Sequence, residues 1–175
     1  SRGLGDVYKR QALSVWKNGE VIKDLISIIL CTYNDEDTIV SSVESILNQT
    51  YQNIEILVLD DGSTDSTYEI LLQNFDDNKR IRIFKNNENI GLTKSLNKLI
   101  KKSNGSVIAR QDADDTSLPN RLEIQMESMI LKNLDFCISR AFIKNSNRLI
   151  PNLSYLIPPK IVIKYKNPFI HGTLF

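Results

Sequence analysis

The sequence has few of the residues that hold small secreted or zinc-bound domains together. It contains two cysteines, Cys31 and Cys137, and one histidine, His171, among 175 residues. Two cysteines cannot build a disulfide framework, and both lie in apolar stretches that indicate buried thiols. With so few ligands of this kind, we do not expect a zinc site made of histidine and cysteine.

The sequence also lacks a long apolar run and an excess of either charge. Its longest apolar run, residues 25–31, is interrupted by Ser27 and is far shorter than the roughly 20 apolar residues of a membrane-spanning helix. The N-terminus has no apolar core of a signal peptide. A net charge of +1 gives no electrostatic reason to expect a nucleic-acid partner. We therefore expect a soluble, cytoplasmic protein that does not bind nucleic acid.

The composition, 41% hydrophobic and 25% charged, is typical of a globular domain. We place that domain at residues 25–175 and treat residues 1–24 as an extension outside it. Residues 1–11 (SRGLGDVYKRQ) resemble a translated sequencing adapter in assembled metagenomic reads, and such a segment would have no role in the fold. The alternative is a short native extension with a helical turn at residues 12–16.

Strand and helix patterns alternate from residue 26 onward. Continuous apolar runs at residues 26–31 and 54–59 predict strands buried on both faces. Residues 81–84 alternate like an edge strand, and residues 107–109 predict a fourth strand. Apolar residues at helical spacing follow each strand, and Asn104-Gly105 is expected to end the third helix. This order predicts an α/β fold, a mostly parallel sheet with helices on both faces.

Ligands in such sheets bind where the strands end, at the carboxyl edge. Polar residues follow three of the predicted strands: Thr32, Tyr33 and Asn34; Asp60, Asp61 and Gly62; and Asp112, Ala113 and Asp114. Carboxylates that converge at one edge repel each other unless a cation or hydrogen-bond donors lie among them. Oxygen ligands of this kind favour Mg²⁺ or Mn²⁺, with water and phosphate oxygens completing the coordination.

Each of these motifs has a simpler explanation when it is taken alone. Asp-Gly-Ser-Thr-Asp (residues 61–65) is also a good turn followed by a helix cap, and Asp-x-Asp is common in loops. Their joint order after successive strands is what points to a ligand site.

Four segments together resemble family 2 glycosyltransferases of the GT-A fold, of the type that builds bacterial surface polysaccharides. The resemblance runs from about residue 26 to the C-terminus. The segments are SIILCTYND (27–35), EILVLDDGSTDST (55–67), NIGLTKSLN (89–97) and ARQDADDTSLPNRLE (109–123), and the last is the most specific.

The resemblance implies an inverting enzyme that moves a sugar from a nucleoside diphosphate sugar, expected to be a UDP-sugar, to a glycan or lipid-linked acceptor. It implies that Asp61 accepts a hydrogen bond from the uracil ring, that Asp112 lies near the ribose and that Asp114 ligates the metal. Thr32, Tyr33 and Asn34 would surround the base. Lys94 and Arg110 would be electrostatic helpers, and the alternative for both is an ordinary solvent-facing residue.

The resemblance also implies a carboxylate base in a later acidic motif. No acidic residue follows Asp135, so we expect the base beyond Phe175 and expect this piece alone to be inactive. The alternative is a non-catalytic fragment that binds nucleotide sugars. His171 is either a residue of the acceptor side or a structural histidine. Lys160, Lys164 and Lys166 indicate either contact with the inner face of the cell membrane or a solvated helix.

A second enzyme class shares part of this pattern. Asp112-x-Asp114-x-Thr116 also fits the nucleophile motif of haloacid-dehalogenase-type phosphatases. However, the motif follows the fourth predicted strand rather than the first, Arg110 and Gln111 interrupt that strand, and no suitable lysine with an acidic pair follows. We therefore rank this alternative below the glycosyltransferase.

Overall fold

The computed structural model describes residues 16–17, 20–21, 24–138, 141–143 and 148–150. Its centre is a four-stranded sheet in the order β5-β4-β3-β6, in which all neighbouring strands are parallel. The strands are β3 (Ile26–Thr32), β4 (Ile54–Asp60), β5 (Ile81–Lys85) and β6 (Val107–Asp112). Two short antiparallel pairs stand apart from this sheet: β1 (Trp16–Lys17) with β2 (Glu20–Val21), and β7 (Ala141–Ile143) with β8 (Arg148–Ile150).

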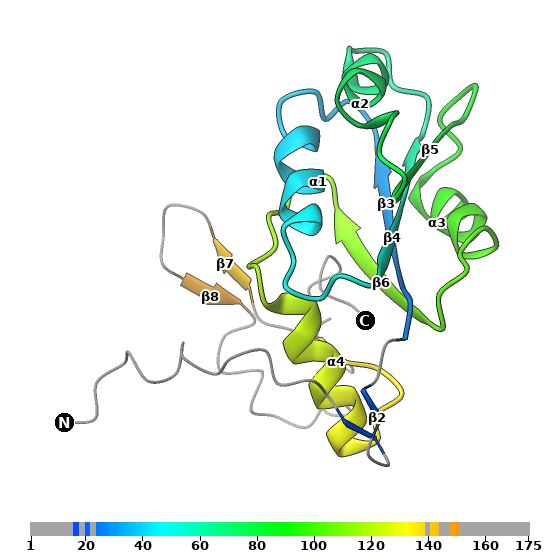
Figure 1. Cartoon of the computed structure of the whole chain (residues 1–175). Helices are drawn as coiled ribbons and strands as arrows, with labels where there is room; N and C mark the ends of the chain where they lie inside the picture. The colour runs from blue at the N-terminus through cyan, green and yellow to red at the C-terminus, as the bar shows by residue number, and fades with distance from the viewer. Residues whose placement is uncertain (1–15, 18–19, 22–23, 139–140, 144–147, 151–175) are drawn as a thin grey trace, which may run out of the picture.

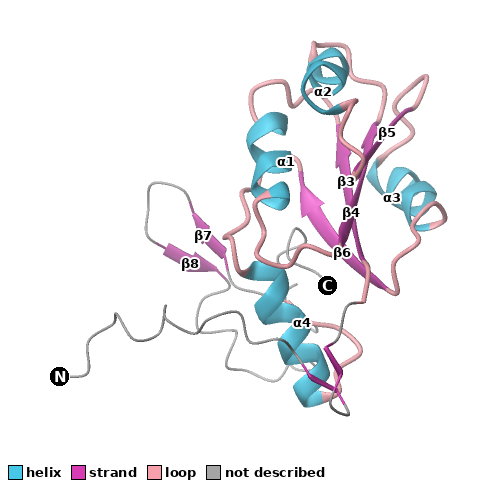
Figure 2. Ribbon diagram, viewed as in Figure 1, coloured by secondary structure: helices cyan, strands magenta, loops and turns pink. Residues whose placement is uncertain are grey.

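Helices cover both faces of the sheet (Figures 1 and 2). They are α1 (Ile39–Leu47), α2 (Thr67–Phe75), α3 (Leu92–Ile100) and α4 (Arg121–Lys132). Buried residues of α1, α2 and α4 belong to one hydrophobic cluster, whereas Leu99 of α3 packs in a second cluster on the opposite face. The fold class expected from the sequence is confirmed.

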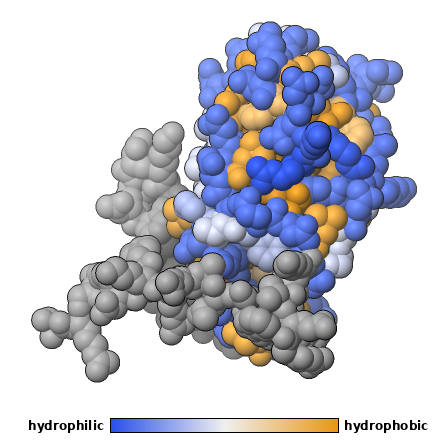
Figure 3. Space-filling view, viewed as in Figure 1, coloured by the Kyte–Doolittle hydropathy of each residue, from blue (hydrophilic) through white to orange (hydrophobic). Residues whose placement is uncertain are grey.

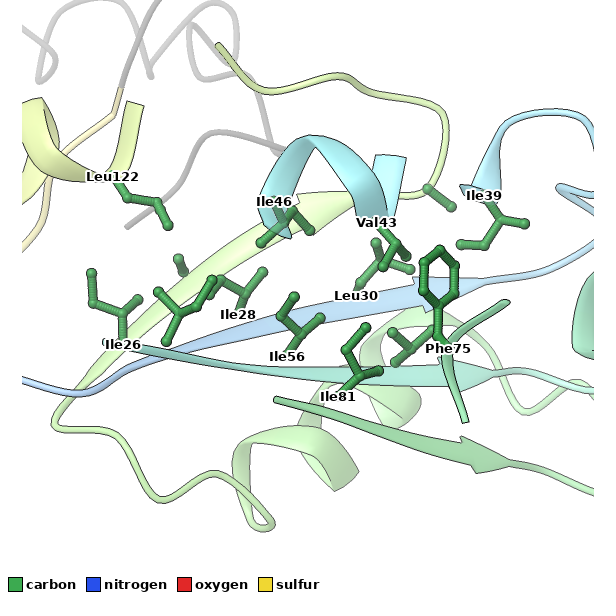
Figure 4. Close-up of a cluster of buried hydrophobic side chains, with 14 of the residues drawn as sticks. Ile26, Ile28, Leu30, Ile39, Val43, Ile46, Ile56, Phe75, Ile81 and Leu122 are labelled. Atoms are coloured by element: carbon green, nitrogen blue, oxygen red, sulfur yellow. The ribbon is translucent and has the colours of Figure 1, made fainter. Parts of the chain in front are cut away.

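Alternation along the strands fills both clusters. Ile26, Ile28 and Leu30 of β3 point to the face covered by α1, where Figure 4 shows them beneath Ile46 and Val43. On the other face Ile29 and Leu57 pack with Leu99. Each fully buried aliphatic side chain of this kind stabilises the fold by about 1.5–3 kcal/mol.

The strand order creates a switch point beside β3. The chain moves outward from β3 through β4 to β5, and then returns to the other side of β3 as β6. At such a point the connections leave in opposite directions and open a crevice at the carboxyl ends of the strands. The loops that follow β3 and β6 therefore border the place where a ligand is expected. β5, predicted as an edge strand, lies at the opposite edge.

One local expectation was wrong, and a second, the alternative of a helical turn at residues 12–16, lies mostly outside the described residues. The third helix ends at Ile100 rather than at Asn104-Gly105, and its C-cap, Lys101, has a right-handed backbone. Gly105 instead lies against the start of β3, where its N–H donates to the Ser27 hydroxyl at 2.8 Å. Trp16 lies in β1 and not in a helical turn, and residues 12–15 are outside the described residues.

No helix within the described ranges is long and apolar enough to cross a membrane. The face seen in Figure 3 is largely hydrophilic, with hydrophobic residues between the hydrophilic ones. Several large apolar side chains in and after α4 are exposed: Ile124, Leu131, Leu134 and Phe136.

Replacement of Gly105 by alanine tests the close approach of this turn to β3. The added Cβ would lie 2.5 Å from the Leu25 carbonyl oxygen and 2.7 Å from the Ser27 nitrogen, both backbone atoms. We expect Gly105→Ala to lower the free energy of unfolding by about 1–3 kcal/mol, because the backbones must move apart. Urea titration measures the loss. The neighbouring exposed Ser106→Ala is the control and should change stability by less than about 0.5 kcal/mol. Equal stabilities of the two variants would contradict this assignment.

Candidate functional site

The loops after β3 and β4 are held together by side chains that bond to the opposite backbone. The Asn34 side-chain oxygen accepts the Thr64 N–H at 2.8 Å, and the Asn34 N–H donates to the Ser63 hydroxyl at 3.0 Å. The Asp35 N–H donates to the Thr67 hydroxyl at 2.9 Å. Asn34 makes this possible with a left-handed backbone, φ 58°, which asparagine tolerates better than most residues. The two loops therefore form one rigid wall of the site.

Thr32 and Tyr33 have different surroundings in this wall. Thr32 is buried, and its hydroxyl donates to the Asp35 carboxylate at 2.7 Å. The Tyr33 N–H donates to the same oxygen at 3.0 Å, while the residue stays 44% exposed. Thr32 therefore shapes the loop, and the Tyr33 ring is free to contact a ligand.

Asp61 lies at the end of β4 and is only 4% exposed. Its Oδ1 accepts hydrogen bonds from the Asn86 amide at 2.7 Å, the Ser95 hydroxyl at 2.9 Å and the Ile90 N–H at 3.1 Å. Its Oδ2 accepts the Gly91 N–H at 2.9 Å. Each carboxylate oxygen has about two acceptor positions. Oδ1 is already crowded by three donors, whereas Oδ2 accepts a single donor and has room for a second.

The environment of Asp61 keeps it ionised. Burial alone raises the pKa of its carboxyl, but the hydrogen bonds from Asn86, Ile90, Ser95 and Gly91 outweigh burial and lower the pKa below 3.8. Gly91 is the N-cap of α3, so the carboxylate also lies at the positive end of that helix. The loop before α3 packs tightly on Gly62, where a Cβ would lie 2.7 Å from the Glu88 carbonyl carbon.

The acidic motif begins at the last residue of β6. Both the Nε and Nη2 atoms of Arg110 donate to Asp112 Oδ1, at 3.0 and 2.8 Å. Arg110 therefore does not point freely into solvent, which was the alternative expected from the sequence. Asp114 is exposed, and no protein donor in the described residues meets its carboxylate. Burial, followed by the charges of Asp114 and Asp112, raises the pKa of Asp115.

Buried polar side chains hold the acidic loop against α1. The Ser42 hydroxyl donates to the Asp112 carbonyl at 3.0 Å, and the Gln111 amide donates to the Asp115 carbonyl at 2.8 Å. Ser117 donates to the Gln111 side-chain oxygen at 2.7 Å. The backbone carbonyls at both ends of the motif are therefore fixed by α1 and β6.

Arg121 contacts the strand that leads into the same loop. It is the first residue of α4 and is buried, and its Nη1 donates to the Arg110 carbonyl at 3.4 Å. Burial lowers the pKa of its guanidinium to about 10, although the charge of Asp115 acts in the opposite direction. Arg121 thus keeps its charge at neutral pH and partly compensates the acidic loop.

The acidic loop fits an open site for a magnesium- or manganese-type ion better than a metal site whose ligands all come from the protein. In the part of the chain that the structure describes, no three His, Cys, Asp or Glu side chains converge as a complete ligand set. Mg²⁺ is commonly held by one or two carboxylates, with substrate phosphates and water completing the shell. Asp114 offers such a carboxylate, and the pKa of the neighbouring Asp115 is raised first by burial and then by the charges of Asp114 and Asp112, which a cation would offset.

Comparison with known proteins identifies the family. Residues 27–174 match the sequence profile described as Glycosyl transferase family 2. The chain belongs to this family. A relative in Escherichia coli, named UDP-Glc:alpha-D-GlcNAc-diphosphoundecaprenol beta-1,3-glucosyltransferase WfgD, is 38% identical over 137 residues, which cover 78% of this chain and 53% of the relative. The chain spans about half the length of the curated relatives it matches.

Solved structures share the fold. TarS (residues 1–349) of S. aureus, in complex with UDP-GlcNAc, superposes with a TM-score of 0.70 at 22% identity, over 86% of this chain and 44% of that one. A mannosyltransferase from Pyrobaculum calidifontis, in complex with GDP-Man and Mn²⁺, gives 0.62 at 20% identity, over 70% and 36% of the two chains. These likenesses confirm the GT-A fold that the sequence motifs predicted.

The structure brings most of the predicted site residues of this family 2 domain to one edge of the sheet. Thr32, Asp61 and Asp112 lie at the ends of adjacent strands. Lys94 is exposed on α3, so its role as a helper stays a prediction. His171, Phe175 and the three lysines at 160, 164 and 166 lie outside the described residues.

Sequence reasoning missed the residues that support the site. Ser42 and Ser45 interrupt the apolar face of α1 three residues apart, and both bond to the acidic motif or its loop. Gln49, also buried, accepts the Leu122 N–H at 3.0 Å and so holds the start of α4. Small hydroxyl residues on an otherwise apolar helix face were the available signal, because a buried hydroxyl needs a partner.

Substitution of Asp61 by asparagine tests its role in the fold. An amide can accept on one atom only, so donors now bonded to the second oxygen would meet an N–H group. We expect Asp61→Asn to lower the free energy of unfolding by about 2–3 kcal/mol at pH 7. Asp77→Asn, at an exposed turn before β5, is the control and should stay within about 0.5 kcal/mol.

The comparison of wild type with Asp61→Asn also predicts a pH dependence of stability. The pKa of Asp61 is lower in the folded state than its ordinary value of 3.8, so ionised Asp61 contributes stability above that pH. That contribution is lost as the pH falls through the folded pKa. The difference between wild type and Asp61→Asn, measured by thermal unfolding, should therefore shrink below pH 3.8. A difference that stays constant down to pH 2 would rule out the ionised carboxylate as its source.

Proposed function

We propose that this domain binds a nucleoside diphosphate sugar and that the whole protein transfers the sugar, with inversion, to a glycan or lipid-linked acceptor in cell-surface polysaccharide synthesis. The observation that carries the proposal is the joint placement of Asp61 and the acidic motif at the carboxyl ends of β4 and β6, on either side of β3. The Asp61 carboxylate is suited to the nucleobase, and the acidic motif is suited to a metal-bound diphosphate. Membership of the family supports this division.

The base is proposed to be uracil, with Tyr33 and Asn34 around it. One acceptor position remains on Asp61 Oδ2, and the uracil ring presents one imide N–H between two carbonyls. Guanine presents two adjacent donors and would need two acceptors. The names of two similar proteins, one with UDP-Glc and one with UDP-GlcNAc, agree with this choice, and one with GDP-Man shows that the fold admits another base.

The diphosphate is proposed to lie beside the acidic motif. Arg110 holds Asp112 in place through two hydrogen bonds, and Asp112 is then directed to the ribose. Asp114 would hold Mg²⁺ or Mn²⁺, which would neutralise charge on the two phosphates and on the departing diphosphate. The similar mannosyltransferase structure that contains Mn²⁺ supports a divalent ion. Lys94 and Arg110 would add positive charge near the phosphates.

The reaction we propose is a single displacement. An acceptor hydroxyl oxygen forms a bond to the anomeric carbon while the bond from that carbon to the diphosphate oxygen breaks. The electron pair leaves with the diphosphate, and a carboxylate base takes the hydroxyl proton. The residues described here would act before and around this step, because they fix the donor so that one face of the anomeric carbon is open to the acceptor.

The acceptor and location are proposed from the relatives. WfgD is named for a GlcNAc-diphosphoundecaprenol acceptor, which is a lipid-linked sugar. We propose that this protein likewise works in the cytoplasm at the inner face of the membrane, where basic residues after Pro159 would contact anionic lipid.

The metal role of Asp114 can be tested by calorimetry of UDP binding to this chain. With Mn²⁺ we expect Asp114→Ala to weaken UDP binding at least about tenfold, because even loss of a supporting residue around a metal costs about 10–100-fold. Without metal, wild type and variant should bind equally weakly. Asp77→Asn, at the amino edge of the sheet, is the control with the same loss of charge and should bind like wild type.

The same measurements separate the alternatives. Equal, metal-independent binding by wild type and Asp114→Ala would sink the assignment of Asp114. Binding of UDP without any sugar transfer by the chain together with the rest of its protein would favour a non-catalytic nucleotide-sugar-binding module. Release of phosphate from a phosphomonoester would favour the phosphatase class.

Inversion makes a prediction about the product. When the whole protein is supplied with an α-linked UDP-sugar and a lipid-linked acceptor, the new glycosidic bond should be β. Proton NMR of the product measures the coupling at the anomeric hydrogen and distinguishes the two forms. An α-linked product would contradict single displacement and would require a retaining mechanism.

A further inference from the structure

Asn86 joins Asp61 to helix α3. It is buried, it is the first residue after β5, and its N–H donates to the Asp60 carbonyl at 2.8 Å. Its side-chain amide donates to Asp61 Oδ1 at 2.7 Å and to the Ser95 hydroxyl at 3.0 Å. Both amide hydrogens are therefore used. The Ser95 hydroxyl accepts a hydrogen bond from Asn86 and donates one to Asp61 Oδ1.

Lys98 determines which way the Asn86 amide faces. Its Nζ atom donates to the Asn86 side-chain oxygen at 2.8 Å. Ser95 and Lys98 are three residues apart on α3, so they lie on the same face of the helix. An ammonium group has donors only, and it therefore requires the amide oxygen on its side and the amide nitrogen on the side of Asp61. In the reverse orientation two oxygens would face each other beside Asp61.

Three donors thus converge on one oxygen of Asp61 from different directions: Asn86, Ser95 and the Ile90 N–H. They fix the plane of the carboxylate. Consequently the direction of Oδ2, which accepts only the Gly91 N–H, is fixed as well.

We propose that Lys98 and Asn86 are positioning residues that orient Asp61 so that its Oδ2 discriminates between pyrimidine bases. This proposal rests on the proposed function, in which Asp61 reads the base. A fixed Oδ2 accepts the N3–H of uracil. Cytosine has an unprotonated N3 at the same place, so the carboxylate would repel it. A carboxylate that can rotate loses the bond to uracil and also relieves the repulsion of cytosine, so both changes reduce selectivity.

Calorimetry of UDP and CDP binding in Mn²⁺ tests the proposal. The variant Lys98→Met removes the donor at an exposed position where folding is not at risk. We expect its preference for UDP over CDP to fall about threefold, the effect of one exposed charged hydrogen bond. Asn86→Leu removes both amide contacts, and we expect that preference to fall at least about tenfold. Lys98→Arg should retain most of the preference.

Lys101→Met is the matched control, the same substitution at the C-cap of the same helix. It should leave both dissociation constants unchanged. Two results would overturn the positioning role. One is a preference for UDP over CDP in Lys98→Met and Asn86→Leu that equals that of wild type. The other is an equal weakening of UDP and CDP binding. Wild-type binding that needs neither Mn²⁺ nor Asp114 would instead sink the proposed function. Metal-dependent UDP binding by wild type with unchanged selectivity in the variants would overturn only the role of Lys98 and Asn86.

Discussion

The hydrogen bonds to the buried carboxylate of Asp61 are the interactions on which the placement of α3 and the loop before it depends. The carboxylate joins the end of β4 to the loop before α3 and to α3 itself. Only one fully buried aliphatic residue of that helix, Leu99, packs against the sheet. One such side chain stabilises by about 1.5–3 kcal/mol, and a single hydrogen bond to a charged group contributes about the same. Polar contacts to Asp61 are therefore at least as important as apolar burial in placing α3.

The two halves of the site are supported from opposite faces of the sheet. α3 holds Asp61 from one face, whereas α1 holds the acidic motif from the other through Ser42 and Ser45. β3 lies between β4 and β6 and fixes how far apart these two groups are. The proposed ligand has a nucleobase at one end and a diphosphate at the other, so it is long enough to contact both Asp61 and the acidic motif. Rigid strands provide that spacing more reliably than loops can.

The sequence was sufficient to predict the elements and the edge of the sheet that carries the site. Apolar runs predicted β3 and β4 to within one residue at their ends, because strands buried on both faces leave a local pattern. The donors to Asp61 could not be predicted in this way. Asn86 and Ser95 are 25 and 34 residues from it, and only the packing of α3 brings them near. Gly105 was misread for a similar reason, since its close approach to Leu25 depends on how distant segments meet.

The distribution of compensating charge explains why a cation would bind at one carboxylate and not at the others. Asp61 is satisfied by four protein donors, and its pKa is lowered despite burial. Asp112 is compensated by Arg110, which approaches it with two nitrogens. Around Asp114 and Asp115 the balance is reversed: burial and the neighbouring carboxylates raise the pKa of Asp115, and no protein donor in the described residues meets Asp114. Negative charge that is only partly compensated, here by Arg121 and Arg110, is where a divalent ion gains most. The same chain thus satisfies one aspartate with its own donors and leaves another without one, which is the division of roles that the proposed function requires.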